Sequence, residues 1–204
     1  MIWAVDRRAS VVVLAKDARV AKTRLQLPRE ETRQLAVSLA AATVRTSFAA
    51  EKVGAVLVVT GDQDISLDAV QVGAEVVAEP RPLGINLAAA LGRQRALELR
   101  PHAPVAVLVA DLPALHPSDL DAVVAEFIAE GAPLFVADHE GTGTTFLIHG
   151  PDTLPGFGFG RSSAAMHWRL GYRRARTGPR SLRWDLDTPQ DLAALVLSNG
   201  LAAS

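Results

Sequence analysis

The sequence predicts a doubly wound α/β domain built on a mixed, mostly parallel sheet. Three observations support this fold class. Its strand-like runs of Val, Leu and Ala are continuous rather than alternating, which indicates burial on both faces of a sheet. Helical segments separate most of these runs, as the crossovers between parallel strands require. The chain has 204 residues, enough for one such domain and short for two, so we treat residues 1–204 as a single domain.

The expected strands are short apolar runs, and they follow one another along the whole chain. They lie at residues 10–15, 55–60, 75–78, 105–110, 134–137 and 144–148. The last two are close enough, across residues 138–143, to form an antiparallel hairpin, which is why the sheet is expected to be mixed.

Helical patterns fill the longer gaps. They lie at about 28–50, 86–99, 120–130 and 189–197, and a shorter helix is expected around His167. Pro28 and Pro189 fall near the starts of the first and last of these, where a missing backbone N–H costs little.

Composition excludes several classes of function. The formal net charge is −1, whereas a surface that binds duplex nucleic acid normally carries a basic excess. The chain has no cysteine, which excludes disulfides and thiolate metal sites. No apolar run approaches membrane-spanning length, and the N-terminus lacks the apolar core of a signal peptide. We therefore expect a cytoplasmic protein with no nucleic-acid or membrane partner.

Positive charge is concentrated in two stretches. Residues 161–183 contain seven arginines and no acidic residue, and residues 16–24 contain four cations against one acid. Such stretches in a nearly neutral protein suit a small polyanionic ligand such as a nucleotide. Solvated helix faces are the competing explanation, and we favour it for most of the later arginines.

The end of the first strand is the first candidate binding position, because ligands of open α/β sheets bind beyond the carboxyl ends of the strands. Lys16, Lys22 and Arg24 follow this strand and could hold a triphosphate. The segment is not a G-x-x-x-x-G-K-[ST] P-loop. A charged, solvated loop explains it equally well.

Three aspartates are the candidate metal ligands. Asp111 follows the apolar strand 105–110, and a buried acid at such a position needs a partner. Asp185 and Asp187 alternate, so in an extended segment they project to the same side and repel unless a cation lies between them. Together the three could hold two Mg²⁺ ions. The competing explanations are helix capping by Asp111, and by Asp187 or Thr188 at the last helix; capping and metal binding can coexist, and near Asp187 we favour both.

Two glycine-rich loops are further candidates. Residues 141–145 lead into a strand, and residues 156–163 lead toward a helix; glycine allows backbone N–H groups to approach a phosphate closely. Each loop on its own is explained as well by a simple turn. Asn86 suits either a helix N-cap or a base or ribose contact, and His167 suits packing or capping better than catalysis.

The order of these motifs is more specific than any one of them. Along the chain they read K-x₅-K-T-R-L, L-G-[IL]-N, A-D-L-P-x-L, G-T-T-x-L, F-G-x-x-S and D-x-D-T-P-x-D-L. This order resembles the 2-phospho-L-lactate / phosphoenolpyruvate guanylyltransferase family of coenzyme F-420 biosynthesis, over about residues 11–197. The resemblance implies a Rossmann-like, glycosyltransferase-A-like nucleotidyltransferase fold.

The resemblance also implies a reaction. GTP binds with Mg²⁺, the phosphate of a small phosphorylated three-carbon acid attacks the α-phosphorus, and pyrophosphate leaves. The acceptor is expected to be phosphoenolpyruvate or 2-phospho-L-lactate. A phosphate acceptor is already ionised near neutral pH, so the reaction needs positioning and charge neutralisation rather than a general base.

The matching motif positions suggest a role for each candidate residue. Asp111, Asp185 and Asp187 would be catalytic metal ligands, and Lys22 would be catalytic as well as nucleotide-binding. Lys16, Lys22 and Arg24 would face the GTP phosphates and Asn86 would lie near guanosine, whereas the acceptor would be held by Gly143, Thr144, Thr145, Gly160 and Ser163. The family loop often has serine directly after glycine, whereas Arg161 intervenes here, so either Ser162 or Ser163 could make the contact.

Other functions stay open. The chain could be a related nucleotidyltransferase acting on 3-phosphoglycerate, a molybdopterin or a sugar phosphate. The last two classes commonly carry a glycine-rich signature after the first strand, and residues 15–24 contain no glycine. A non-catalytic GTP-binding module is the alternative from another class, although it gives no reason for all three aspartates. The oligomeric state is not readable from the sequence, and a homodimer stays open.

Overall fold

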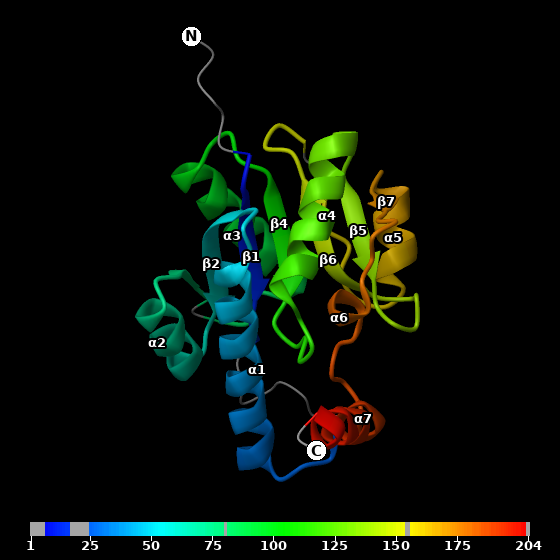
Figure 1. The fold of residues 1–204 in the computed structure, drawn as a ribbon. Coiled ribbons are helices and arrows are strands. Elements are labelled where there is room, and N and C mark those ends of the chain that lie inside the picture. The colour runs from blue at the N-terminus through cyan, green and yellow to red at the C-terminus, as the bar shows by residue number, and fades with distance from the viewer. Residues whose placement is uncertain (1–6, 17–24, 80, 154–155, 203–204) are drawn as a thin grey trace.

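A single seven-stranded sheet organises the chain. The computed structural model describes residues 7–16, 25–79, 81–153 and 156–202 (Figure 1). The strands are β1 (Ala9–Leu14), β2 (Val53–Thr60), β3 (Glu75–Ala78), β4 (Val105–Val109), β5 (Leu134–Ala137), β6 (Thr144–His149) and β7 (Arg173–Arg174). Their order across the sheet is β3-β2-β1-β4-β6-β5-β7. The six strands expected from the sequence are all present, and β7 is an addition.

The sheet is mixed, as predicted. Strands β1, β2, β3 and β4 pair in parallel, β6 pairs antiparallel with both β4 and β5, and β7 is parallel to β5. Two antiparallel steps return β5 to the direction of β4. The carboxyl ends of β1, β4 and β5 therefore share one edge of the sheet with the start of β6. We call this the carboxyl edge.

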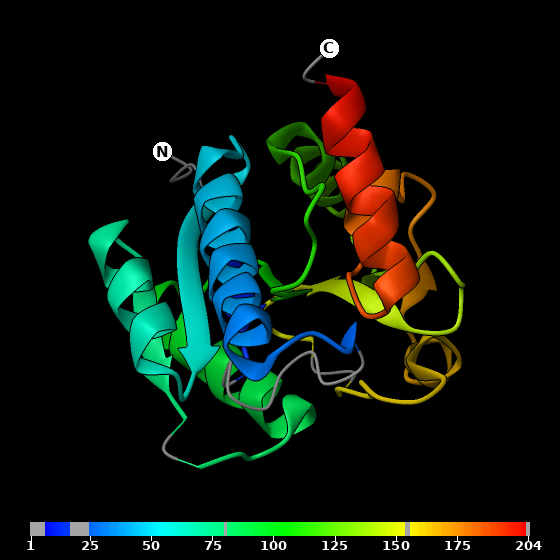
Figure 2. The ribbon, with the colours of Figure 1, turned by 90° about the horizontal axis from the view of Figure 1, so that it is seen from below.

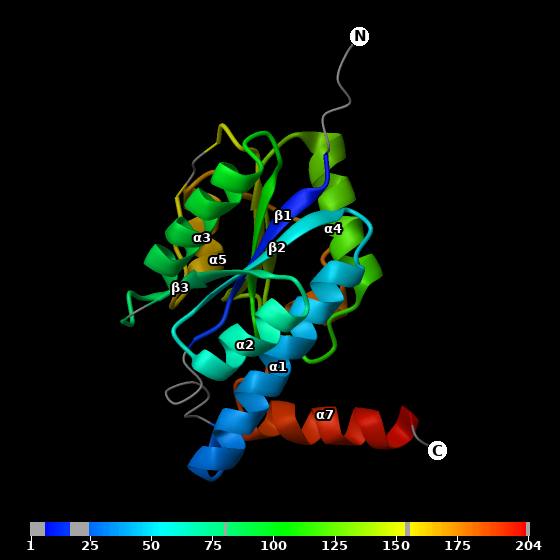
Figure 3. The same ribbon diagram turned by 90° about the vertical axis from the view of Figure 1, so that its left-hand side faces the viewer.

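Seven helices are described. They are α1 (Arg29–Ala49), α2 (Gln63–Gln71), α3 (Ile85–Leu99), α4 (Pro117–Glu130), α5 (Ser163–Arg169), α6 (Arg180–Arg183) and α7 (Pro189–Ala202). Helices α1, α2 and α4 cover one face of the sheet, and α3 and α5 cover the other (Figure 3). The four longer helices and α5 agree with the sequence prediction, whereas α2 and α6 were not predicted. Helix α2 buries only Ile65 and Ala69, and its Leu67 and Val70 are exposed.

Alternation along the central strands divides the core between the two faces. In β1, Val11 and Val13 face α1 and α4, whereas Val12 and Leu14 face α3. Helix α3 lies close to the sheet at Gly92, where an added Cβ would stand 2.2 Å from a methyl carbon of Val12. The continuous apolar strands are explained by this cover on both sides.

Helix α7 packs against α1 away from the sheet (Figures 2 and 3). Leu25, Leu39 and Leu186 form the buried centre of this contact. Because Leu186 is buried here, it fixes the extended segment that carries Asp185 and Asp187. None of the helices in the described part of the chain is long and apolar enough to cross a membrane.

Candidate functional site

Three segments meet at the carboxyl edge. The first follows β4 and carries Asp111. The second runs from α6 to α7 and carries Asp185 and Asp187. The backbone N–H of Leu186 donates to the carbonyl oxygen of Asp111 at 3.0 Å, which joins these two segments. The third is the loop of residues 138–143, which connects β5 to β6. The convergence of the three predicted aspartates is thus produced by the fold.

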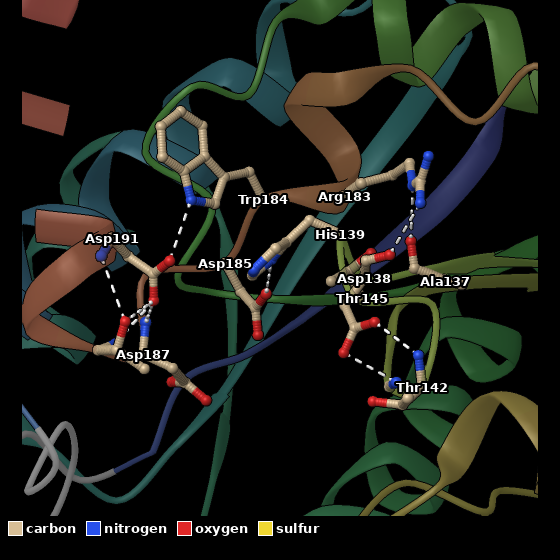
Figure 4. A network of polar contacts seen from close by, with 12 residues as sticks. Ala137, Asp138, His139, Thr142, Thr145, Arg183, Trp184, Asp185, Asp187 and Asp191 are labelled. Carbon is tan, nitrogen blue, oxygen red and sulfur yellow. Dashed lines mark hydrogen bonds and ion pairs between the residues drawn. The ribbon is translucent and has the colours of Figure 1, made fainter. Parts of the chain in front are cut away.

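Asp185 has the most perturbed carboxyl group of this region. Burial raises its pKa, and the negative charges of Asp111, Asp187 and Asp138 raise it further, to about 6. The imidazole Nδ1 of His139 lies 3.7 Å from Oδ1 of Asp185 (Figure 4). We call Asp111, Asp138, Asp185 and Asp187 the acidic cluster. Its mutual repulsion indicates a place where a cation would be favourable.

The acidic cluster fits a cation that brings part of its own coordination shell. Among the described residues, no group of three or more His, Asp or Glu side chains is arranged to hold a metal ion by itself. The two-ion cage expected from the sequence is therefore not preformed. Mg²⁺ commonly takes one or two carboxylates and completes its shell with water and phosphate oxygens, which this arrangement allows. Ligation by Asp111, Asp185 and Asp187 stays a prediction.

A capping box sets the position of Asp187. The hydroxyl of Thr188 accepts the N–H of Asp191 at 3.2 Å, and Oδ2 of Asp191 accepts the N–H groups of Thr188 at 2.7 Å and of Asp187 at 3.1 Å. Burial opposes ionisation of Asp191, but these hydrogen bonds outweigh it and hold its pKa below the usual value. The expected cap at Thr188 is confirmed. Asp191 was overlooked, although the T-x-x-D spacing signals such a box.

Asp138 shapes the loop of residues 138–143. Its carboxylate oxygens accept the N–H groups of Thr142 at 2.9 Å and Gly143 at 2.8 Å (Figure 4). A Cβ on Gly143 would stand 2.3 Å from Asp138 Oδ2, so only glycine fits there without a shift. The guanidinium of Arg183 donates to the carbonyls of Ala137 at 3.3 Å and Asp138 at 3.2 Å, which ties this loop to the segment carrying Asp185. Asp138 is a site residue that the sequence did not identify.

The predicted acceptor residues lie near one another, but their side chains differ in access. The hydroxyl of Thr144 is buried and lies 2.9 Å from Nδ1 of His167. The hydroxyl of Thr145 is buried and donates to the carbonyl of Leu182, so its proton is not available to a substrate while that bond holds. Ser163 begins α5, and its N–H donates to the carbonyl of Gly160 at 3.2 Å.

The two serines of this loop can now be compared. Ser163 is 2% exposed, whereas Ser162 is exposed and adopts a left-handed backbone with φ 57°. Gly160 is also exposed, with φ 126°. Direct contact with an acceptor is therefore easier for Ser162 than for the Ser163 hydroxyl.

The predicted nucleotide-binding residues are only partly described. Lys16 follows β1 and is exposed, while Lys22 and Arg24 lie outside the described residues. Both ends of the Asn86 side-chain amide are engaged by Phe159: its Nδ2 donates to the carbonyl at 3.1 Å and its Oδ1 accepts the N–H at 2.8 Å. The predicted guanosine contact stays untested, and the structure gives Asn86 a different task, fastening residues 156–160 to α3.

Comparisons with known proteins identify the family to which this chain belongs. Residues 11–174 match the family described as MobA-like NTP transferase domain. A phosphoenolpyruvate guanylyltransferase of Thermomonospora curvata is 40% identical over 94% of this chain and 85% of its own length. One from Streptosporangium roseum is 40% identical over 94% of this chain and 86% of its own length.

Solved structures with a similar fold are much more distant in sequence. A protein described as a nucleotide-diphospho-sugar transferase from Desulfovibrio desulfuricans superposes with a TM-score of 0.72 at 14% identity, covering 94% of this chain and 87% of its own. A nucleotidyl transferase from Methanothermobacter gives 0.62 at 17% identity, covering 96% and 99%. These two confirm the predicted nucleotidyltransferase fold.

Proposed function

Because the chain belongs to the phosphoenolpyruvate guanylyltransferase family of MobA-like NTP transferase domains, we propose that it transfers GMP from GTP to the phosphate of phosphoenolpyruvate. Pyrophosphate is the leaving group, and coenzyme F-420 biosynthesis is the pathway we assign to it. The observation that carries the proposal is the acidic cluster at the carboxyl edge, next to the glycine-containing loops that lead into β6 and α5. That is where an α/β sheet binds a nucleotide and where phosphate chemistry needs a cation.

The proposed reaction asks little proton transfer of the protein. The acceptor phosphate is ionised near neutral pH and attacks the α-phosphorus of GTP directly, so positioning and charge balance determine the rate. A bound Mg²⁺ would neutralise phosphate charge, with Asp111, Asp185 and Asp187 as its protein ligands. The chain itself orients these groups: Leu186 holds Asp185 and Asp187 beside Asp111, and Asp191 fixes the backbone of Asp187.

Substrate recognition would be divided between the residues that follow β1 and the loops that lead into β6 and α5. Lys16, with Lys22 and Arg24, would face the triphosphate. Thr144, Gly160 and Ser163 mark the region proposed for the acceptor's phosphate or carboxylate, where exposed Gly160 and Ser162 make the backbone accessible. A loop with backbone N–H groups free of bulky side chains suits an oxyanion.

Alternative acceptors differ from phosphoenolpyruvate by a few atoms. We place 2-phospho-L-lactate and 3-phosphoglycerate behind it because the relatives with 40% identity carry the phosphoenolpyruvate name. A non-catalytic GTP-binding module is disfavoured by the acidic cluster. Without a cation, this cluster would repel the triphosphate of a nucleotide.

The test offers the purified protein GTP and Mg²⁺ together with each of the three acids in turn. The products are identified by mass spectrometry, and pyrophosphate release is measured in parallel, with ATP and CTP as nucleotide controls and EDTA as the metal control. We expect a guanosine diphosphate-linked adduct, formed fastest with phosphoenolpyruvate. GTP binding without pyrophosphate release for every acid would contradict the proposal and support the binding module instead.

A further inference from the structure

His167 is a fully buried polar side chain that the proposed reaction does not use. It lies in α5, with 0% of its surface exposed. Its ring is enclosed by those of Phe159, Tyr172 and Phe135, with centroid separations of 5.0, 5.5 and 6.4 Å. Placing an imidazole in such surroundings costs free energy unless its nitrogens are hydrogen-bonded. The identity of its partners therefore indicates what it does.

Both ring nitrogens have partners, and these come from different segments. The backbone N–H of Gly158 donates to Nε2 at 2.9 Å, so Nε2 is unprotonated and the ring proton is on Nδ1. Nδ1 lies 2.9 Å from the hydroxyl of Thr144, to which it donates, and the carbonyl of Ser163 also interacts with the ring. Burial lowers the pKa of His167 to about 4, against the effect of the Ser163 carbonyl, so the neutral ring required by these bonds is the stable form near pH 7.

These partners have one property in common: they surround the proposed acceptor region. Thr144 begins β6, Ser163 begins α5, and Gly158 belongs to residues 156–162, which we call the acceptor loop. At Gly158 an added Cβ would stand 2.3 Å from the side chain of Met166, so the loop lies directly on α5. Asn86 holds the next residue of the loop, Phe159, by two hydrogen bonds.

We propose that His167 is a positioning residue that joins the acceptor loop to the start of β6 and thereby sets the affinity for the phosphorylated acid; this rests on the proposed function. The ring contacts the acceptor loop and the start of β6, whereas Asp111, Asp185 and Asp187, the predicted metal ligands, lie on the segments after β4 and before α7. Its removal therefore weakens binding of the acceptor and leaves binding of GTP almost unchanged. A histidine kept only for packing would have no such preference between substrates.

Three substitutions separate these roles. H167F keeps an aromatic ring and removes both nitrogens. H167Q places an amide oxygen near the position of Nε2, where it can accept the N–H of Gly158. H167N places an amide nitrogen near Nδ1, where it can donate to Thr144. The matched control is H149F, because His149 is equally buried and ring-packed: its ring lies 6.1 Å from that of Phe157, and its Nδ1 interacts with the carbonyl of Gly150, outside the acceptor loop.

Steady-state kinetics give the first test, after circular dichroism has verified folding of each variant. We expect H167F to raise KM for the acceptor about 10-fold or more, the size associated with a buried donor left without its acceptor, with KM for GTP unchanged within about 2-fold. H167Q should recover most of this loss and H167N less of it, and H149F should resemble wild type. Equal acceptor KM in H167F and wild type, or equal increases for both substrates, would overturn the inference.

Amide hydrogen exchange gives a second test that needs no turnover. Exchange in residues 156–162 should be faster in H167F than in wild type, partly restored in H167Q, and unaltered in H149F. Unchanged exchange in H167F would overturn the positioning role, even if the enzyme reaction proved different from the proposed one. Absence of turnover in the wild type with every acid, by contrast, would reject the proposed function but not the positioning role. If H167F does not fold, the comparison of H167Q with H167N decides the same question.

Discussion

The acidic cluster and the surroundings of His167 differ in charge and in how well their polar groups are satisfied. In the acidic cluster, burial and, after it, neighbouring negative charges raise the pKa of Asp185 to about 6, which means that the folded chain tolerates an unfavourable carboxylate. Around His167, burial lowers the pKa to about 4 and each ring nitrogen has a hydrogen-bond partner. The first region is arranged to gain from a cation, and the second is complete without any ligand. The carboxylates proposed to bind a metal ion are thus held in an unfavourable environment, while the loop proposed to bind the acceptor is held by satisfied hydrogen bonds.

The largest expected effect comes from the acidic cluster. Asp111→Asn and Asp185→Asn should each reduce pyrophosphate release by about 1,000-fold, because the charge that would bind Mg²⁺ and neutralise phosphate is lost. Thermal unfolding without Mg²⁺ should show no loss of stability, and Asp185→Asn should stabilise the fold at pH 7 by roughly 1–3 kcal/mol. This sign follows because the folded pKa of Asp185 exceeds the unfolded value of 3.8. The gain should shrink as the pH falls from 6 toward 4.

The matched control for these variants is Asp152→Asn. Asp152 is exposed and follows β6, whose carboxyl end lies at the opposite edge of the sheet. It should change neither turnover nor stability. Near-full turnover by Asp111→Asn or Asp185→Asn would reject the metal-site assignment.

As the pH falls, the two buried histidines should change the stability of the fold in the direction opposite to that expected for Asp185. The folded pKa of about 4 for His167 and His149 lies below the unfolded value of 6.5, so the unfolded chain binds more protons between these limits. Each histidine therefore destabilises the fold as the pH falls from 6.5 to 4, by up to roughly 3 kcal/mol. Asp185 acts in the opposite direction over the lower part of this range.

Denaturant unfolding at several pH values can separate these contributions. The slope of stability against pH should be flatter than wild type in H167F and in H149F, and steeper in Asp185→Asn. Identical slopes in wild type and H167F would mean that His167 titrates normally in the folded chain. The electrostatic contrast between the surroundings of His167 and the acidic cluster would then be wrong.

The strands and longer helices could be predicted because they depend on local apolar runs. So could the position of the three aspartates, since strand ends and an extended D-x-D segment have predictable directions. Strand β7 could not be predicted, because Arg173–Arg174 has no apolar pattern and is a strand only by virtue of its pairing with β5. The short α6 likewise depends on packing of Leu182 in the finished core.

The residues that support the candidate site could not be predicted from the sequence, for a different reason. Asn86 and Phe159 are separated by 73 positions in the chain, so no local sequence pattern predicts their contact. Asp138 acts on a loop whose shape depends on Gly143. His167 was expected to be packed or capping, and it is packed, but its hydrogen-bond partners Gly158 and Thr144 belong to other segments. Residue types at strand ends are readable from sequence, whereas contacts between loops are not.

Asn86 provides a smaller test of which substrate depends on the loop. Asn86→Ala removes two hydrogen bonds to Phe159, together worth about 2 kcal/mol, or about 30-fold in affinity if one substrate bears the whole loss. Fastening of the acceptor loop predicts that KM for phosphoenolpyruvate rises. A guanosine contact predicts instead that KM for GTP rises and that discrimination between GTP and ITP weakens. Asn86→Asp, which retains an acceptor for the Phe159 N–H, should show about half of the free-energy loss.

The smallest expected effect concerns the support of the acidic cluster by the α7 capping box. Asp191→Asn removes the charge that accepts the N–H groups of Asp187 and Thr188, and should cost about 1 kcal/mol of stability and a several-fold loss of turnover. The matched control is Asp62→Asn, since Asp62 caps α2 by accepting the N–H groups of Asp64 and Ile65. It should cost similar stability but no turnover. If both variants lost turnover in proportion to stability, the cap at Asp191 would serve the fold alone and Asp187 would need no orientation from it.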